Sequence, residues 1–477
     1  MSDQIHYETA EQDKIPLHKK IIYGFGALVN NALADAMGRM MIVLNLGLGM
    51  SPTLAGLLGA LPRLLDALTD PLMGYISDNT KSRWGRRRPY IFIGAILVGI
   101  VFAVLWQLLP EGESEDYYFW VFLAGSIVFY LAYTIFATPW VALGYELTPD
   151  YHERTRLMGV QSFMGYSVYM VTPWVLWFMQ NDAWFDNIME GAASLAMIVG
   201  AFAIFVGILP AIFLKEKITA PVGLTPQESK SMGIKDFFSG FLATIKFKPF
   251  LCLCAATFLV FNGFMMVSNF QAYVIIYYVF GGDQALGSEY TGYAGTLSAA
   301  ATFFSIAITS WLATKIGKRR AFFWAIGVSA VGYGLKWFCY NPEIPWLLLV
   351  PMPLLAFGLG PLFALMGSMI ADVCDMDELE RGERREGMFG SIFWWVVKLG
   401  MAAALAMGGV LLTGSGFDVE LGSAQTEQAL FWMRFFDAFL PMIFSLIAIF
   451  MVYLYPITEE KAHQIREELE ARRGVKV

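Results

Sequence analysis

Long apolar runs separated by short polar segments dominate this sequence. Twelve of the runs reach about 20 residues, the length that an α-helix needs to cross the hydrocarbon core of a bilayer. Their expected ranges are 21–48, 53–77, 90–109, 118–147, 158–179, 191–214, 248–280, 290–314, 321–340, 345–372, 388–413 and 429–455. Because the runs are continuously apolar, they predict an all-α integral membrane protein with twelve transmembrane helices.

The polar segments between the runs alternate in charge. One series is rich in Lys and Arg, as in SRWGRRR, whereas the alternate series, such as EGESED and NPEIP, holds neither. Basic loops stay on the cytoplasmic side of a membrane. We therefore expect a multi-pass protein of the plasma membrane, such as a bacterial inner membrane, whose N-terminal tail (1–20) and C-terminal tail (457–477) are both cytoplasmic.

Two short motifs recur along the chain. Residues 85–88 (GRRR) return as 317–320 (GKRR), and residues 154–159 (RTRLMG) return as 385–390 (REGMFG). Both motifs are displaced by roughly 230 residues, which indicates an internal repeat. The repeat predicts a major-facilitator fold with two six-helix halves, 21–214 and 248–456, joined by a cytoplasmic linker at 215–247.

Composition narrows the class of protein. Hydrophobic residues make up 57% of the chain and charged residues 15%, whereas soluble proteins have about 25% charged residues. The 33 Lys and Arg do not exceed the 40 Asp and Glu, so nucleic acid is not an expected partner. The cysteines and histidines show no metal-ligand spacing, and no nucleophile lies beside a recognisable base. We expect a monomer that is not an enzyme and has no cofactor, with the bilayer and a small molecule as partners.

Three ionisable residues share one helix face in the second run. Asp66 and Asp70 are four residues apart, and Arg63 precedes Asp66 by three. A charge at the centre of a transmembrane helix costs about 2.5–3.5 kcal/mol, so each of these residues is a functional candidate. Two carboxylates on one face can coordinate a hard cation or share protons. The alternative is an Asp–Arg pair that only neutralises itself.

A basic residue lies in the middle of the eleventh run. Lys398 is too deep to reach the interface easily, and Trp394 lies one turn before it on the same face. The ammonium can pair with the carboxylates of the second run, and the ring can support the C–H face of a sugar. Packing is the alternative explanation for Trp394.

Two further pairs of opposite charge lie within runs. Asp35 and Arg39, four apart in the first run, form either a functional pair or one that neutralises itself. Arg434 and Asp437, three apart in the last run, are expected to be structural.

Acids and bases also gather at the cytoplasmic ends of both halves. Salt bridges among them can close an inner gate and break when it opens. The alternative is charge that sets topology beside solvated acids. The expected groups are Asp78 with Arg83, Arg86 and Arg87; Glu146 with Arg154; and Asp372, Asp375 and Asp377 with Arg384 and Arg385.

Three segments carry a family resemblance. They are DALTDPLMGYISDNTKSRWGRRRPY, YTIFATPWVALGYELTPDYHERTRLMG and ADVCDMDELERGERREGMFGSIFWWVVKLG. They resemble the glycoside-pentoside-hexuronide:cation symporter family, whose best-known member is the melibiose carrier. The resemblance covers nearly the whole chain and implies a twelve-helix major-facilitator fold that takes up a glycoside, driven by Na⁺, H⁺ or Li⁺.

The resemblance also implies roles for single residues. Asp66 and Asp70 match the two helix-2 carboxylates of the family's cation site. Its nearby arginine, its helix-4 threonine and its helix-11 lysine fall on Arg63, Thr134 and Lys398.

The chain departs from the family pattern at three positions. A helix-4 aspartate shared between cation and sugar is replaced by Ala137, which Thr138 follows, and two sugar-binding residues of helices 1 and 5 are replaced by Asn31 and Ser162. The galactoside site is therefore rebuilt, whereas the cation site is mostly kept. The expected cation ligands are Asp66, Asp70, Thr134 and Thr138. The residues expected to bind substrate are Asn31, Asp35, Arg63, Trp394 and Lys398.

Together these features predict a secondary active transporter. We expect symport of a sugar or glycoside with H⁺ or Na⁺ by alternating access. Without a third carboxylate, fewer anionic oxygens oppose the dehydration of Na⁺, which favours H⁺ slightly. The alternatives are a cation-coupled carrier of an amphiphile such as a lysolipid, and a non-transporting membrane receptor.

Overall fold

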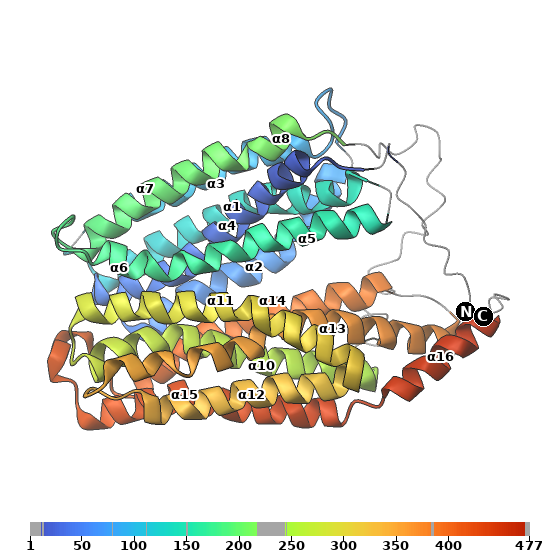
Figure 1. The fold of residues 1–477 in the computed structure, drawn as a ribbon. Helices are drawn as coiled ribbons and strands as arrows, with labels where there is room; N and C mark the ends of the chain where they lie inside the picture. The colour runs from blue at the N-terminus through green and yellow to red at the C-terminus, as the bar shows by residue number, and fades with distance from the viewer. Residues whose placement is uncertain are drawn as a thin grey trace. The chain divides into compact units, whose positions relative to one another are not determined.

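The described part of the chain is helical throughout. The computed structural model describes residues 11, 14–78, 80–110, 112–148, 151–216, 244, 246–382 and 386–472, and none of these lies in a strand (Figure 1). Ten described helices are long and apolar enough to cross a membrane. Two expected spans, 53–77 and 158–179, are not among the ten. The first carries three charged residues near its middle, and the second is interrupted.

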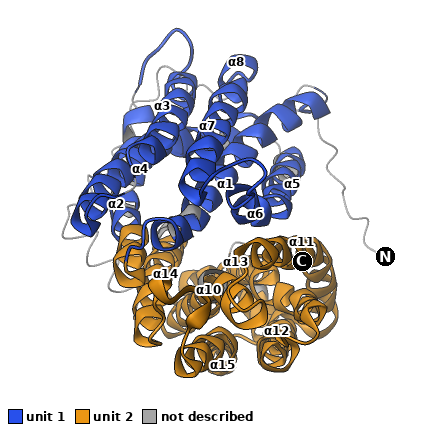
Figure 2. Ribbon diagram, turned by 90° about the vertical axis from the view of Figure 1, so that its left-hand side faces the viewer, with its two compact units in different colours: residues 1–50, 61–224 blue, residues 51–60, 225–477 orange. Residues whose placement is uncertain are grey.

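The first compact unit comprises the described residues of 1–50 and 61–224 (Figure 2). Within it, α3 packs against α4 and α7, and α1 packs against α5 and α7. Its helices are α1 (Leu17–Leu46), α2 (Pro52–Asp78) from residue 61 onward, α3 (Arg88–Gln107), α4 (Glu115–Glu146), α5 (Tyr151–Ser167), α6 (Val175–Met179), α7 (Ile188–Gly207) and α8 (Leu209–Phe213).

The fifth expected span is broken in its middle. The α-helix ends at Ser167, and two short 3₁₀ helices, η2 (Val168–Met170) and η3 (Thr172–Trp174), lead into α6. Pro173 lies in η3. Proline has no N–H to donate and clashes with the preceding turn, which disfavours a regular α-helix at this point.

The second compact unit comprises residues 51–60 and the described residues of 225–477. Within it, α10 packs against α14 and α15, and α12 packs against α13 and α15. Its further elements are α10 (Lys248–Tyr273), the π-helix η4 (Val274–Val279), α11 (Gln284–Ile316), α12 (Lys318–Cys339), η5 (Pro345–Leu349), α13 (Met352–Arg381), α14 (Glu386–Gly414), η6 (Val419–Ala424), α15 (Glu427–Tyr453) and α16 (Glu459–Arg472).

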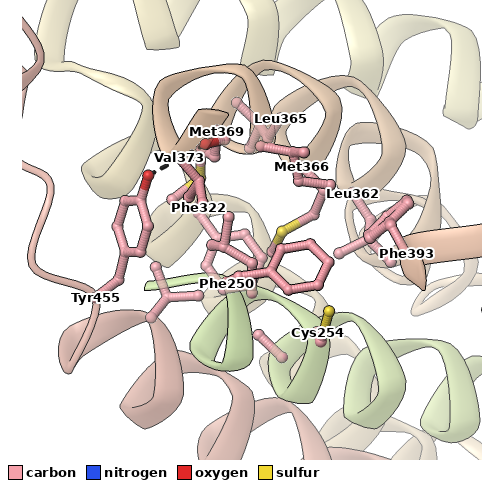
Figure 3. Packing of buried hydrophobic residues seen from close by; sticks show 14 of the residues in the cluster. Phe250, Cys254, Phe322, Leu362, Leu365, Met366, Met369, Val373, Phe393 and Tyr455 are labelled. Atoms are coloured by element: carbon pink, nitrogen blue, oxygen red, sulfur yellow. Dashed lines mark hydrogen bonds between the residues drawn. The ribbon is translucent and has the colours of Figure 1, made fainter. Parts of the chain in front are cut away.

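The core of the second unit joins α16 to the transmembrane helices. Figure 3 shows buried side chains of α10, α12, α13 and α14 packed around Phe250, Phe322 and Met366. The Tyr455 hydroxyl donates to the Met369 carbonyl at 3.2 Å. Apolar residues of α16 are buried in the same cluster, so this tail helix is part of the folded unit.

The first turns of α2 group with the second unit, although the expected halves place them in the first. A Cβ on Gly409 of α14 would lie 2.2 Å from the Pro52 carbonyl oxygen, so only glycine allows this approach. The Thr53 and Thr413 hydroxyls lie 2.8 Å apart and share a hydrogen bond. Small residues and hydroxyls of this kind let transmembrane helices pack closely.

A buried ion pair joins α12 to α15. Lys336 Nζ lies 2.5 Å from Asp437 Oδ2, and the two side chains are 0% and 1% exposed. Arg434, which shares α15 with Asp437, lies instead between the rings of Tyr278 and Trp337, at 3.9 and 4.3 Å from their centroids. Arg434 and Asp437 therefore find separate partners on neighbouring elements, and the sequence analysis had not singled out Lys336.

Breaking this ion pair from one side should destabilise the protein. Lys336→Met leaves a buried carboxylate without its cation, which should cost about 3–5 kcal/mol of unfolding free energy. The double variant Lys336→Met/Asp437→Leu buries no charge and should recover most of the loss. Thermal unfolding of the purified protein in detergent measures both effects. A single variant as stable as the wild type would contradict the assignment.

Candidate cation-binding site

α2 positions the two carboxylates on one face. The Ser51 hydroxyl accepts a hydrogen bond from the Leu54 N–H at 3.3 Å and so caps the helix start. Fifteen residues beyond Ser51, Asp66 is buried, at 8% exposure, and Asp70 is half-buried. Both therefore lie inside α2 and away from its ends.

Two threonines of α4 donate hydrogen bonds to these carboxylates. Thr134 Oγ1 lies 2.9 Å from Asp66 Oδ1, and Thr138 Oγ1 lies 3.1 Å from Asp70 Oδ1. The pairs follow the same order along both helices, since Asp66 bonds to Thr134 and Asp70 bonds to Thr138. α2 and α4 therefore run in the same direction, as two even-numbered crossings of a membrane should.

A third hydroxyl lies beside the Asp66–Thr134 pair. Thr69 Oγ1 lies 3.3 Å from Thr134 Oγ1 and donates to the Asp66 carbonyl at 3.2 Å. Carboxylate, hydroxyl and carbonyl oxygens are the ligands that hard cations prefer. The arrangement brings together all four expected cation ligands, and their role in binding an ion stays a prediction.

Two tyrosines of α4 contact neighbouring helices close to Thr134 in the sequence. The guanidinium of Arg63 lies 5.6 Å from the centroid of the Tyr130 ring. The Tyr133 hydroxyl donates to Asn30 Oδ1 at 2.8 Å, which joins α4 to α1. Sequence reasoning missed Tyr130, Tyr133 and Asn30. The four-residue spacing of Tyr130 from Thr134 was a signal that could have identified this face.

The other expected substrate residues of the first unit have local partners. Asn31 Oδ1 accepts a hydrogen bond from Asn30 Nδ2 at 3.1 Å. Arg39 Nε lies 2.6 Å from Asp35 Oδ2, which is the pair that their spacing predicted. Asp35 is therefore compensated within α1.

Lys398 and Trp394 belong to α14 of the second unit. Trp394 is 57% exposed, and one face of its ring stacks on Phe363 of α13, with centroids 5.7 Å apart and planes inclined by 13°. Lys398 is half-buried one turn further along α14. The stack fixes an aromatic surface beside the ammonium, and its use by a substrate stays a prediction.

Glu146, an expected gating residue of the first unit, bonds to arginines of the turn before α3. Glu146 Oε1 accepts hydrogen bonds from Arg86 Nη2 at 2.8 Å and from Arg87 Nη2 at 3.0 Å. Arg87 also donates to the Ser77 hydroxyl at 2.6 Å. Glu146 thus bonds to the turn before α3, which belongs to the same unit. Arg83 is exposed, and the side chains of residues 78 and 154 lie outside the described part.

Two expected gating acids of the second unit, Asp372 and Asp377, form ion pairs with described residues. Lys318 Nζ lies 2.7 Å from Asp372 Oδ1, and Arg381 Nε lies 3.1 Å from Asp377 Oδ1. The expected partners of these acids, Arg384 and Arg385, lie outside the described residues, as do most of the linker 215–247 and the tail 1–20. Asp375, which lies between Asp372 and Asp377 on α13, is half-buried.

A buried acid fixes the start of α1 to α5. Glu153 accepts hydrogen bonds from the Ile15 N–H at 2.9 Å and from Arg156 at 3.1 Å, and Lys20 Nζ lies 2.7 Å away. Burial raises the pKa of the Glu153 carboxyl, but the hydrogen bonds from Lys20, Ile15 and Arg156 outweigh burial and lower the pKa below its usual value. The carboxylate form therefore holds the chain before α1 in place.

Comparison with known proteins identifies the family of this chain. The model of the MFS/sugar transport protein family matches residues 22–459. An isoprimeverose transporter of Lactiplantibacillus pentosus is 26% identical, covering 85% of this chain and 81% of its own. A glucuronide carrier protein homolog of Escherichia coli is 24% identical over 95% of both chains. The sodium-dependent lysophosphatidylcholine symporter 1 of Mus musculus is also 24% identical, over 98% of this chain and 91% of its own.

Solved structures agree in fold. A bacterial homolog of the human lysosomal transporter Spinster, in an inward-facing and unoccupied conformation, has a TM-score of 0.67 at 16% identity, covering 92% of this chain and 96% of its own. A D-xylose-proton symporter has a TM-score of 0.60 at 14% identity, covering 92% and 98%. The chain has a major-facilitator fold, and it belongs to the MFS/sugar transport protein family as a symporter of the glycoside-pentoside-hexuronide:cation type.

Proposed function

We propose that this protein is a secondary active transporter that moves a sugar or glycoside into the cell together with H⁺ or Na⁺. The observation that carries the proposal is the alignment of Asp66 with Thr134 and of Asp70 with Thr138 inside the first unit. Retaining two carboxylates within a membrane helix is costly, and a coupling ion gives them a use. The names of the isoprimeverose and glucuronide relatives support a glycoside as substrate.

The oxygen ligands leave both ions open. Na⁺ would take the two carboxylates and the hydroxyls of Thr134 and Thr138, with Ala137 in place of a further acid. A proton would be shared between Asp66 and Asp70, which lie one turn apart on the same face of α2. The first choice predicts that Na⁺ drives transport at constant pH, and the second predicts that a pH gradient drives it alone.

For the substrate, we propose polar contacts from Asn31, Asp35 and Arg63 and an aromatic support from Trp394. The exposed Trp394 ring is held by its stack on Phe363, so it loses little freedom when a sugar ring rests on it. Lys398 would donate to substrate hydroxyls. We expect the ammonium of Lys398 to be attracted to the carboxylates of α2 in the ion-free carrier, and a bound cation would then release Lys398 to the substrate.

A lysolipid-like amphiphile is the second candidate. The support for it is the mouse lysophosphatidylcholine symporter, which is as similar to this chain as the glucuronide carrier homolog is. Competition by a lysolipid against sugar counterflow in proteoliposomes separates the two substrates, and absence of counterflow for either would favour a receptor.

The expected orientation has both termini and the linker 215–247 in the cytoplasm, because the basic turns before α3 and α12 share one side of the membrane in that arrangement. Labelling of single cysteines from either side of the membrane tests it.

Neutralising either carboxylate should uncouple transport. Asp66→Asn or Asp70→Asn removes an anionic ligand of the ion, so uphill accumulation should fall until internal and external substrate concentrations are about equal. Downhill exchange should persist. Uptake of labelled sugar into proteoliposomes under an ion gradient measures both. Asp116→Asn changes an exposed acid at the start of α4 and serves as the control. If both variants still concentrate substrate, the ion is held elsewhere and Asp35 becomes the next candidate.

Changes at Lys398 and Trp394 should separate coupling from affinity. Lys398→Gln should weaken substrate binding about tenfold, which corresponds to the loss of one charge-assisted hydrogen bond, and should flatten its dependence on Na⁺ or pH. Trp394→Ala should weaken binding but keep the ion dependence, and Trp395→Ala is the matched control. Binding isotherms at several ion concentrations measure both quantities. An undiminished ion dependence in Lys398→Gln would refute the link.

A further inference from the structure

Arg88 and Glu216 link the turn before α3 to the end of α8, because each binds backbone groups of the other's segment. Arg88 Nε donates to the Ala211 carbonyl at 2.6 Å and so satisfies the C-terminal end of α8. In return, Glu216, just beyond α8, accepts hydrogen bonds from the backbone N–H groups of Arg86 at 3.1 Å and Arg87 at 2.8 Å. The carboxylate thus lies at the N-terminus of α3, where negative charge is favourable.

A glycine makes room for this carboxylate. Gly85 has φ +105°, and a Cβ at this position would lie 2.7 Å from Glu216 Oε1. The backbone conformation requires glycine, and the missing Cβ leaves room for the carboxylate. The G of the GRRR motif is therefore explained by the positive φ of this turn.

We call these contacts of Arg88 and Glu216 the clasp. The clasp fixes the two arginines that bond to α4. Because Glu216 holds the N–H groups of Arg86 and Arg87, the side chains of these residues leave the turn toward Glu146. Glu216 and Glu146 are both hydrogen-bond acceptors, so they do not bond to each other. It acts on the arginine–Glu146 contact through the backbone of the turn.

The second unit places a related set of residues at the corresponding turn. Gly317 has φ +82°, and a Cβ there would lie 2.8 Å from Glu459 Oε2. Arg319 donates to the Tyr453 carbonyl at the end of α15, as Arg88 does at the end of α8. Lys318 pairs with Asp372 of α13, as Arg86 and Arg87 pair with Glu146 of α4.

We propose that Glu216 and Glu459 are positioning residues for the conformational cycle, an inference that rests on the transport function proposed above. Glu216 holds the basic turn of its unit on the end of α8, and Glu459 lies against the turn at Gly317, just beyond the end of α15. Arg86 and Arg87 then stay bonded to Glu146 of α4, and Lys318 to Asp372 of α13. The helix ends of each unit therefore move as one body. The substrate residues lie elsewhere, so the acids affect the rate of the cycle and not the affinity for substrate.

Hydrogen exchange tests the positioning without any substrate. In Glu216→Ala, the amides of Arg86 and Arg87 lose their acceptor and should exchange at least about tenfold faster than in the wild type. Lys215→Gln changes the exposed neighbouring residue and should leave exchange unchanged. Unchanged exchange in Glu216→Ala would overturn the clasp, whether or not the protein carries a sugar.

Transport kinetics test the role in the cycle. Glu216→Ala and Glu459→Ala should lower the maximal rate of sugar exchange about tenfold, with KM within about twofold of the wild type. Glu216→Asp keeps the charge and should restore part of the rate. Glu216→Gln, which retains one acceptor oxygen, serves if the alanine variant does not fold. Faster amide exchange with an unchanged maximal rate would overturn the proposed role. A wild type that moves no sugar would contradict the transport function and leave the exchange result to decide the clasp.

Discussion

The cost of placing charge inside a bilayer governs how this molecule is built. Every ionisable side chain in a membrane helix must be compensated by a partner, by a ring face or by a ligand. The structure uses each solution in a different place. Lys336 and Asp437 form a buried ion pair, and Arg434 lies between two aromatic rings. The carboxylates of α2 accept hydrogen bonds from hydroxyls of α4.

The same cost distinguishes charges that neutralise one another from those for which we propose a bound ion. The Lys336–Asp437 pair is almost completely buried and carries no net charge, so it can join α12 to α15 at any stage of a transport cycle. Asp66 and Asp70 are two acids on one face, surrounded by oxygen donors that suit a small cation. Such a face gains most when a cation arrives, which is the property that ion coupling needs. At the helix ends, where water is near, the charges serve instead to fix turns, as Glu216 and Glu146 do.

Much of this was predictable from periodicity, and the rest depends on contacts between distant segments. The apolar runs predicted the spans, and the four-residue spacing of Asp66 and Asp70 predicted their common face. The partner of Asp437 could not be predicted, because Lys336 lies on another helix about 100 residues away and no local rule joins them. Glu216 was also missed, since its counterpart Glu459 does not follow the offset of the GRRR and GKRR motifs. Glu146 and Asp372, which were expected to act in gating, pair with Arg86, Arg87 and Lys318 of the turns before α3 and α12, and their role in gating stays a prediction.

Ion movement driven by substrate tests the central claim most directly. If the carboxylates of α2 couple an ion to a sugar, an inward gradient of a transported sugar should draw H⁺ or Na⁺ into proteoliposomes that start with no ion gradient. In the Asp66→Asn/Asp70→Asn double variant the sugar should still equilibrate, and the ion should not enter. Sugar entry without ion movement in the wild type would contradict symport, and undiminished ion entry in the double variant would contradict the site.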